Sequence, residues 1–129
     1  PPLPVLAADT EVILDGTIFG KPADAADAAR MLAALSGRTH EVMTALFVKW
    51  GQEIHGALST SRVTFGTLDP AQIERYCATA EPLDKAGAYA IQGRGAALVA
   101  RIEGSYSGVV GLPLYETAEA LAQIGVSVL

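Results

Sequence analysis

Asp9 and Thr10 are the first residues whose types and order could carry chemistry. They follow a short apolar run, Val5 to Ala8, that predicts a strand. A carboxylate at the end of a strand, with a hydroxyl beside it, can hold a divalent cation or orient a water molecule. The alternative is that Asp9 only caps the local backbone, and its position alone favours that alternative.

Lys21 is the second candidate, because it lies between Gly20 and Pro22 directly before a predicted helix. An ammonium whose stem is fixed in such a turn can be aimed at phosphate oxygens, and the helix N-terminus would help to hold an anion. The stretch is not a P-loop, because the required glycine spacing and the Ser or Thr after the lysine are absent. The alternative is an exposed turn lysine.

The third candidate is the segment from Glu81 to Gly93, which collects acids, a base, a tyrosine and a glutamine. Gln92 offers one donor and one acceptor, and reading the edge of a pyrimidine requires both. The alternative is a solvated loop in which Asp84 and Lys85 form a local charge pair. The residue types favour the two interpretations about equally.

Composition limits the partners and the compartment. The chain has 129 residues, 50% of them hydrophobic and 18% charged, with a net charge of -5. This composition excludes intrinsic disorder, and no apolar run is long enough to span a membrane. The acidic balance argues against nucleic acid as a partner. A single cysteine, Cys77, predicts a reduced, cytoplasmic protein, and His40 and His55 lack the spacing of metal ligands.

The periodicity and the turn residues predict one α/β domain over residues 1–129, with a mixed sheet and flanking helices. Extended segments are expected at 5–14, 17–19, 40–50, 57–68, 96–102 and 106–110. Helices are expected at 23–36, from Asp69 to about Thr79, and at 113–124, with a loop over 81–95. Asp15-Gly16 predicts a tight hairpin, and Asp69 with Gln72 predicts a capping box.

Taken together, these stretches resemble the Maf family of nucleoside triphosphate pyrophosphatases. The resemblance covers nearly the whole chain, and it is most specific in the long loop and in the closing stretch. The matching segments are Ala8-Asp9-Thr10, Gly20-Lys21-Pro22, Met31-Leu32, Leu35-Ser36-Gly37, Thr39-His40, Glu81 to Tyr89, Ile91-Gln92-Gly93, Ile102, Gly104-Ser105-Tyr106, Val109 to Leu114, and Glu116.

The resemblance implies an elongated, Maf/ITPase-like fold with a central cleft, in a protein that is often dimeric. The implied activity is hydrolysis of dTTP or UTP to the monophosphate and pyrophosphate. Asp9 would be the family's catalytic acidic residue, activating water or holding a divalent metal, with magnesium expected. The lysines would lie on the phosphate side, and the residues equivalent to Thr10 and Gln92 set base choice in the family. The implied substrate-binding residues are Thr10, Lys21, Asp84, Lys85 and Gln92.

Members of this family begin with a strand and a Ser-x-Ser-Pro-Arg-Arg loop that cradles the phosphates. The present sequence starts just before the Asp9 motif, so the resemblance implies a fold without that N-terminal portion and with exposed strand edges. Two alternatives follow: a non-catalytic relative that associates through its exposed sheet, and a related inosine triphosphate pyrophosphatase. Pyrophosphate release from dTTP and UTP, or preference for ITP, discriminates among the three hypotheses.

Overall fold

A computed structural model describes residues 3–129, so the expected domain boundary at residue 1 lies outside the described residues. Five strands form one sheet in the order β2-β1-β3-β4-β5, and every pair of neighbours is antiparallel. The strands are β1 (Val5–Leu14), β2 (Thr17–Phe19), β3 (Thr39–Trp50), β4 (Glu53–Phe65) and β5 (Val99–Glu103). The expected α/β fold with flanking helices is confirmed, but residues 3–129 contain no parallel strand pair of the kind a mixed sheet implies.

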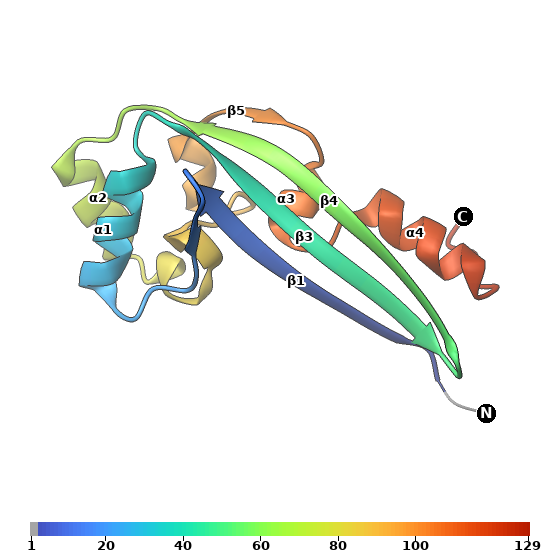
Figure 1. Cartoon of the computed structure of the whole chain (residues 1–129). Helices are drawn as coiled ribbons and strands as arrows, with labels where there is room; N and C mark the ends of the chain where they lie inside the picture. Colours follow the sequence, from blue (N-terminus) through green and yellow to red (C-terminus); the bar gives the residue numbers. More distant parts are fainter. Residues whose placement is uncertain (1–2) are drawn as a thin grey trace.

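The three long strands β1, β3 and β4 form an elongated, twisted ribbon (Figure 1). The helices α1 and α2 pack together at one end of this ribbon, whereas α3 and α4 lie against β3 and β4. These helices are α1 (Ala25–Leu35), α2 (Pro70–Cys77), α3 (Tyr106–Val110) and α4 (Leu114–Gln123). None of the helices within residues 3–129 has the length and apolar character needed to cross a membrane.

The Asp15-Gly16 turn and the Asp69–Gln72 capping box form where the sequence predicts them, and Asp24 caps α1. Asp15 and Gly16 both have positive φ, 50° and 76°, as the tight turn between β1 and β2 requires. The side chain of Asp24 accepts a hydrogen bond from the backbone of Asp27 at 2.8 Å and so caps α1. At the start of α2, Asp69 and Gln72 form the predicted capping box.

The segment 106–110 is a helix, α3, and the prediction of a strand there is wrong. The Ser105 side chain accepts a hydrogen bond from the backbone of Gly108 at 2.9 Å, which caps a helical turn. The partner expected for this strand, β5, pairs with β4 instead. Apolar runs this short do not discriminate a strand from a buried helix, and here the cap decides. The strand predicted over 57–68 is also displaced, because β4 runs from Glu53 to Phe65.

The loop predicted over 81–95 is mostly short 3₁₀ turns: η1 (Glu81–Asp84), η2 (Ala86–Ala88) and η3 (Arg94–Leu98). Its middle, Gly87 to Ile91, is buried. The alternative of a fully solvated loop is therefore wrong for this part of the segment.

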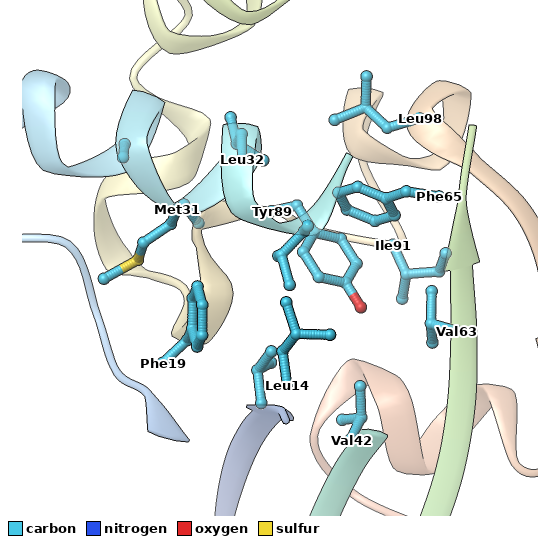
Figure 2. Packing of buried hydrophobic residues seen from close by; sticks show 14 of the residues in the cluster. Leu14, Phe19, Met31, Leu32, Val42, Val63, Phe65, Tyr89, Ile91 and Leu98 are labelled. Atoms are coloured by element: carbon cyan, nitrogen blue, oxygen red, sulfur yellow. The ribbon is translucent and has the colours of Figure 1, made fainter. Parts of the chain in front are cut away.

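The main core joins this buried segment to the sheet and to α1 (Figure 2). A second, smaller apolar cluster lies between α4 and the sheet. The labelled side chains of the main core are Leu14, Phe19, Met31, Leu32, Val42, Val63, Phe65, Tyr89, Ile91 and Leu98. The smaller cluster consists of Leu46, Val48, Ala120 and Ile124.

His40 lies inside the main core with 1% of its surface exposed. Its Nε2 atom is 2.7 Å from the hydroxyl of Tyr89, its ring stacks edge to face on Phe65, and its Nδ1 atom has no hydrogen-bond partner in the described structure. Burial disfavours the charged imidazolium and lowers the pKa of His40 to about 4. The side chain is therefore neutral and structural at pH 7.

Acid should therefore destabilise this fold as the pH falls from about 6.5 to about 4. Above pH 6.5 His40 is neutral in both the folded and the unfolded chain. Below pH 6.5 the unfolded chain takes up a proton that the folded chain refuses until about pH 4. This difference removes about 3 kcal/mol of the free energy of unfolding between these two pH values. Urea denaturation at pH 7 and pH 4.5 measures the loss.

The His40→Gln variant should lose this part of the pH dependence. The matched control is Ser61→Ala, which removes a buried hydroxyl from the neighbouring strand without removing a titrating group and should keep the wild-type slope. A wild-type slope in His40→Gln would contradict the assignment.

Candidate functional site

One pocket brings together all six side chains singled out in the sequence. It has a volume of about 250 Å³ and lies among β1, β3, α3 and the segment from η1 to Gln92. Its polar lining is Asp9, Thr10, Lys21, Asp84, Lys85 and Gln92. These residues come from three stretches of the chain, and their individual roles remain predictions.

β1 presents Asp9 and Thr10 at an open edge of the sheet. β2 pairs with β1 only from Val12 to Leu14, so no strand within residues 3–129 covers the edge beside Asp9 and Thr10. Adjacent residues of a strand point to opposite faces. The pocket includes both residues at this edge, where the exposed Asp9 carboxylate meets water and the Thr10 side chain is half-buried.

A chain of hydroxyl hydrogen bonds fixes the orientation of Thr10. Thr44, which faces Thr10 across the β1–β3 ladder, donates its hydrogen to the carbonyl of Gly108 at 2.7 Å. Its hydroxyl is 2.9 Å from the Thr10 hydroxyl. Since Thr44 has only one hydroxyl hydrogen, Thr10 must donate to Thr44. Thr10 therefore presents only acceptor lone pairs to the pocket.

The lysine turn is attached to the long loop. The backbone N–H of Gly87 donates to the carbonyl of Gly20 at 3.1 Å, which places the Lys21 turn beside η2. Gly87 has a φ of 73° and packs so tightly that a Cβ there would approach the Val12 side chain to 2.9 Å. Only glycine meets both demands. This contact holds Lys21 and Lys85 on the same pocket.

The charges of the pocket are two ammonium groups and two carboxylates. Lys85 Nζ lies 3.7 Å from the Asp84 carboxylate, and both side chains keep contact with solvent. Lys21 and Asp9 form no ion pair within residues 3–129. A pocket with one ammonium, Lys21, and one carboxylate, Asp9, that are both unpaired in the described part of the chain suits an anionic ligand and a bound cation together.

The walls of the pocket are apolar, and sequence reasoning did not assign them to the site. Tyr89 and Ile91 line it from the loop, and Val109 and Val110 line it from α3. Burial raises the pKa of the Tyr89 phenol, which stays neutral and hydrogen-bonded to His40. The available signal was the apolar run Tyr89-Ala90-Ile91 directly before the polar Gln92, inside a segment otherwise rich in charged and small residues.

The carboxylates of this pocket are compatible with one mode of binding a divalent cation, in which the protein supplies only part of the ligands. Asp9 and Asp84 are its two carboxylates. Within residues 3–129 no group of three or more His, Cys, Asp or Glu side chains is arranged to hold a metal ion. Magnesium is commonly held by one or two carboxylates together with substrate phosphates and waters, rather than by a complete protein cage. The donor set is compatible with that mode.

A larger groove, about 570 Å³, lies between α1 and α2. Alanines, Pro70 and Ile73 form most of its lining, and Glu74 is its one charged residue. Cys77 also lines it, and burial raises the pKa of this thiol, which disfavours the reactive thiolate. This groove lacks the groups that phosphate chemistry needs, so the smaller charged pocket is the candidate site.

The fold and the pocket define an α/β protein with a charged pocket at an open edge of its antiparallel sheet. The profile of the family described as Maf-like protein matches residues 1–124. The chain therefore belongs to the Maf family.

Similar proteins come from several bacteria. The chain is 59% identical over 123 residues to a "dTTP/UTP pyrophosphatase" of Cupriavidus pinatubonensis. The aligned residues make up 95% of this chain and 62% of that protein. It is 55% identical over 128 residues to a protein of the same name from Nitrosomonas europaea, covering 99% and 62%. It is 60% identical over 119 residues to a "Nucleoside triphosphate pyrophosphatase" of Xylella fastidiosa, covering 92% and 63%. The chain thus spans less than two thirds of the length of these relatives.

Replacing Thr44 with valine should loosen both sides of the pocket, because it removes the acceptor for Thr10 and the donor to Gly108. Both partners are then left without their buried hydrogen bond, and the free energy of unfolding should fall by about 1–3 kcal/mol. Chemical denaturation measures the loss. The control is Thr60→Val on the exposed face of β4, which should change stability little. Equal effects of the two variants would argue against the hydroxyl chain.

Proposed function

We propose that this chain carries the catalytic pocket of a nucleoside triphosphate pyrophosphatase acting on dTTP and UTP. The observation that supports the proposal most directly is the gathering of two lysines, two carboxylates, Thr10 and Gln92 around one pocket. The names of the similar proteins give the substrates. The reaction adds one water molecule across the α–β phosphate anhydride and yields a nucleoside monophosphate and pyrophosphate.

In the proposed mechanism Asp9 acts on the water. Its carboxylate is exposed at the open edge of β1, where it can accept a proton from an attacking water molecule. Lys21 and Lys85 bind phosphate oxygens and offset the negative charge that develops on the leaving pyrophosphate. Phosphoryl transfer depends mainly on this positioning and charge neutralisation, and not on a covalent intermediate.

Magnesium is the proposed cofactor, with Asp9 as its ligand; the second carboxylate, Asp84, lines the same pocket. When bound, the ion neutralises phosphate charge and lowers the pKa of a coordinated water. The protein supplies the carboxylates, and the substrate phosphates supply the remaining charged oxygens.

Thr10 and Gln92 are the proposed readers of the base. Thr10 offers an acceptor, because its hydrogen is committed to Thr44, and Gln92 offers one donor and one acceptor. A uracil or thymine edge carries an N–H flanked by two carbonyl oxygens, and these groups match that combination. Tyr89 and Ile91 supply apolar surface for the ring of the base.

A second candidate function is a non-catalytic interaction protein, and one observation favours it. The face of the sheet opposite α3 and α4 carries large exposed apolar side chains: Val5, Phe47, Ile54 and Leu58 are 52–60% exposed. Contiguous exposed apolar surface commonly marks an association site. A homodimer formed through this face is compatible with either function.

We place the protein in the cytoplasm because one cysteine cannot form an internal disulfide.

Asp9→Asn should abolish the proposed reaction while keeping the shape of the pocket. Loss of a general base lowers the rate by about a hundredfold or more. The measurement is pyrophosphate release from dTTP, UTP and ITP with magnesium, before and after chelation. Metal-dependent release from the wild type that disappears in the variant supports the proposal. Equal release from both, or none from either, would reject it in favour of the interaction protein, and a preference for ITP would reject the pyrimidine assignment.

Lys21→Met and Lys85→Met should each weaken the binding of dTTP about tenfold, because each removes one charged hydrogen bond to phosphate. The loss should shrink as salt is raised, since salt screens the wild-type interaction. Calorimetric titration at two salt concentrations measures both effects. Lys49→Met, which removes an exposed lysine of β3 far from the pocket lining, is the control and should bind as the wild type does.

A further inference from the structure

The backbone that follows Gln92 is anchored to a single carboxylate. Glu81 Oε1 accepts a hydrogen bond from the backbone N–H of Arg94 at 3.0 Å, and Oε2 accepts one from Gly95 at 3.0 Å. Oε2 also accepts a hydrogen bond from the hydroxyl of Tyr76. One side chain at the start of η1 thus holds two successive amides thirteen and fourteen residues further along the chain.

The backbone that precedes Gln92 is anchored to the same pair. The Tyr76 hydroxyl donates to Glu81, so its lone pairs are free to accept, and it accepts the N–H of Ala90 at 3.1 Å. Gln92 therefore lies in a short arch, residues 90–95, both ends of which are attached to the Tyr76–Glu81 pair. Tyr76 itself is fixed by burial in the core.

The arch fits this pair closely enough to exclude side chains. A Cβ on Gly93 would overlap the Glu81 carboxylate. A Cβ on Gly95 would lie 2.7 Å from the Tyr76 hydroxyl and 2.6 Å from the carbonyl of Ala90. Both glycines are needed for close approach of the backbone. The arch consequently has little freedom to shift relative to α2.

The charge state of the pair supports the same geometry. Burial opposes the charge of Glu81, but the hydrogen bonds from Tyr76, Arg94 and Gly95 outweigh it and leave the pKa of this carboxyl below its usual value. Burial and the neighbouring Glu81 raise the pKa of Tyr76, which stays protonated. At neutral pH the pair is a carboxylate acceptor with a hydroxyl donor, as the three backbone contacts require.

The side chain of Gln92 is exposed in the pocket and makes no hydrogen bond of its own within the described part of the chain. Thr10, the other proposed reader, is fixed on β1. Two readers on separate segments can test one base edge only if the distance between them is fixed. We propose that the Tyr76–Glu81 pair is a positioning element that gives the pocket its preference for a uracil-type base by holding the arch that carries Gln92.

This inference rests on the proposed function, because it assigns the Tyr76–Glu81 pair a role in recognising the base in the same pocket. It predicts that the pair affects recognition of the base and leaves recognition of the phosphates alone. The lysines that would bind phosphate lie outside the arch, on the turn at Lys21 and at Lys85. Inorganic tripolyphosphate, which has no base, is therefore the internal reference ligand.

The experiment uses Tyr76→Phe and Glu81→Gln, with Tyr115→Phe and Glu119→Gln on exposed positions of α4 as matched controls. Calorimetric titrations with magnesium give the dissociation constants of tripolyphosphate and of the α,β-methylene analogues of UTP and CTP, which the proposed reaction cannot cleave. The preference for the UTP analogue over the CTP analogue should fall about tenfold in the first two variants, as expected for misplacing one hydrogen-bonding group. Affinity for tripolyphosphate should stay at the wild-type value, and both controls should match the wild type throughout.

Amide hydrogen exchange without ligand provides the second readout. The amides of Ala90, Arg94 and Gly95 should exchange faster in Tyr76→Phe than in Tyr115→Phe. Tyr76→Phe keeps the buried ring, so it remains a valid test if Glu81→Gln fails to fold.

Three outcomes would count against the inference. Unchanged preference for the UTP analogue in a folded Tyr76→Phe would overturn it while leaving the proposed function intact. An equal loss of affinity for both analogues and tripolyphosphate would also overturn it, because that pattern indicates a general structural role. A wild-type chain that binds no nucleotide would overturn the proposed function itself, and the inference with it.

Discussion

The pocket depends on the burial of one irregular segment, Gly87 to Ile91, against the sheet and α1. Tyr89 is the centre of this contact: its ring meets Phe65 edge to face, and its hydroxyl bonds the buried His40. Aromatic burial of this size is among the larger stabilising contributions that a single side chain makes. Because this segment cannot leave the sheet without exposing the core, Lys85 and Gln92 at its two ends are held beside β1.

The polar part of the pocket is built on the rim of that apolar contact. Asp9, Lys21 and Asp84 keep their charged groups in contact with water, so they bear little of the cost of burying charge. The buried polar atoms behind the rim are mostly paired, as Thr44 is with Gly108. Charged groups on a rigid apolar support can meet a ligand without large rearrangement, which reduces the entropy lost on binding.

Local chemistry decided which parts of this structure the sequence could predict. The Asp15-Gly16 turn and the Asp69–Gln72 capping box depend on neighbouring residues, and both form as predicted. The segment 106–110 was mistaken for a strand, because its apolar residues suit a strand as well as a helix and the deciding cap at Ser105 is a single hydrogen bond.

The candidate site shows the same division. Its polar residues could be named from their types and from the family resemblance, and all of them line one pocket. The contributions of Tyr76 and of Thr44 could not be foreseen, since each depends on a partner brought close by the fold, Ala90 in one case and Gly108 in the other. Hydrogen bonds between segments far apart in the chain leave no periodic trace in a sequence.

The double position of Tyr89 has a consequence for how this protein can change over time. The same ring is packed in the interior on one side and lines the ligand pocket on the other. A substitution that repacks the interior around Phe65 will therefore also move part of the lining of the candidate pocket. In proteins whose sites lie on separate loops, substitutions among core hydrophobic residues usually leave activity unchanged. In this protein such substitutions should alter ligand choice and thermal stability together.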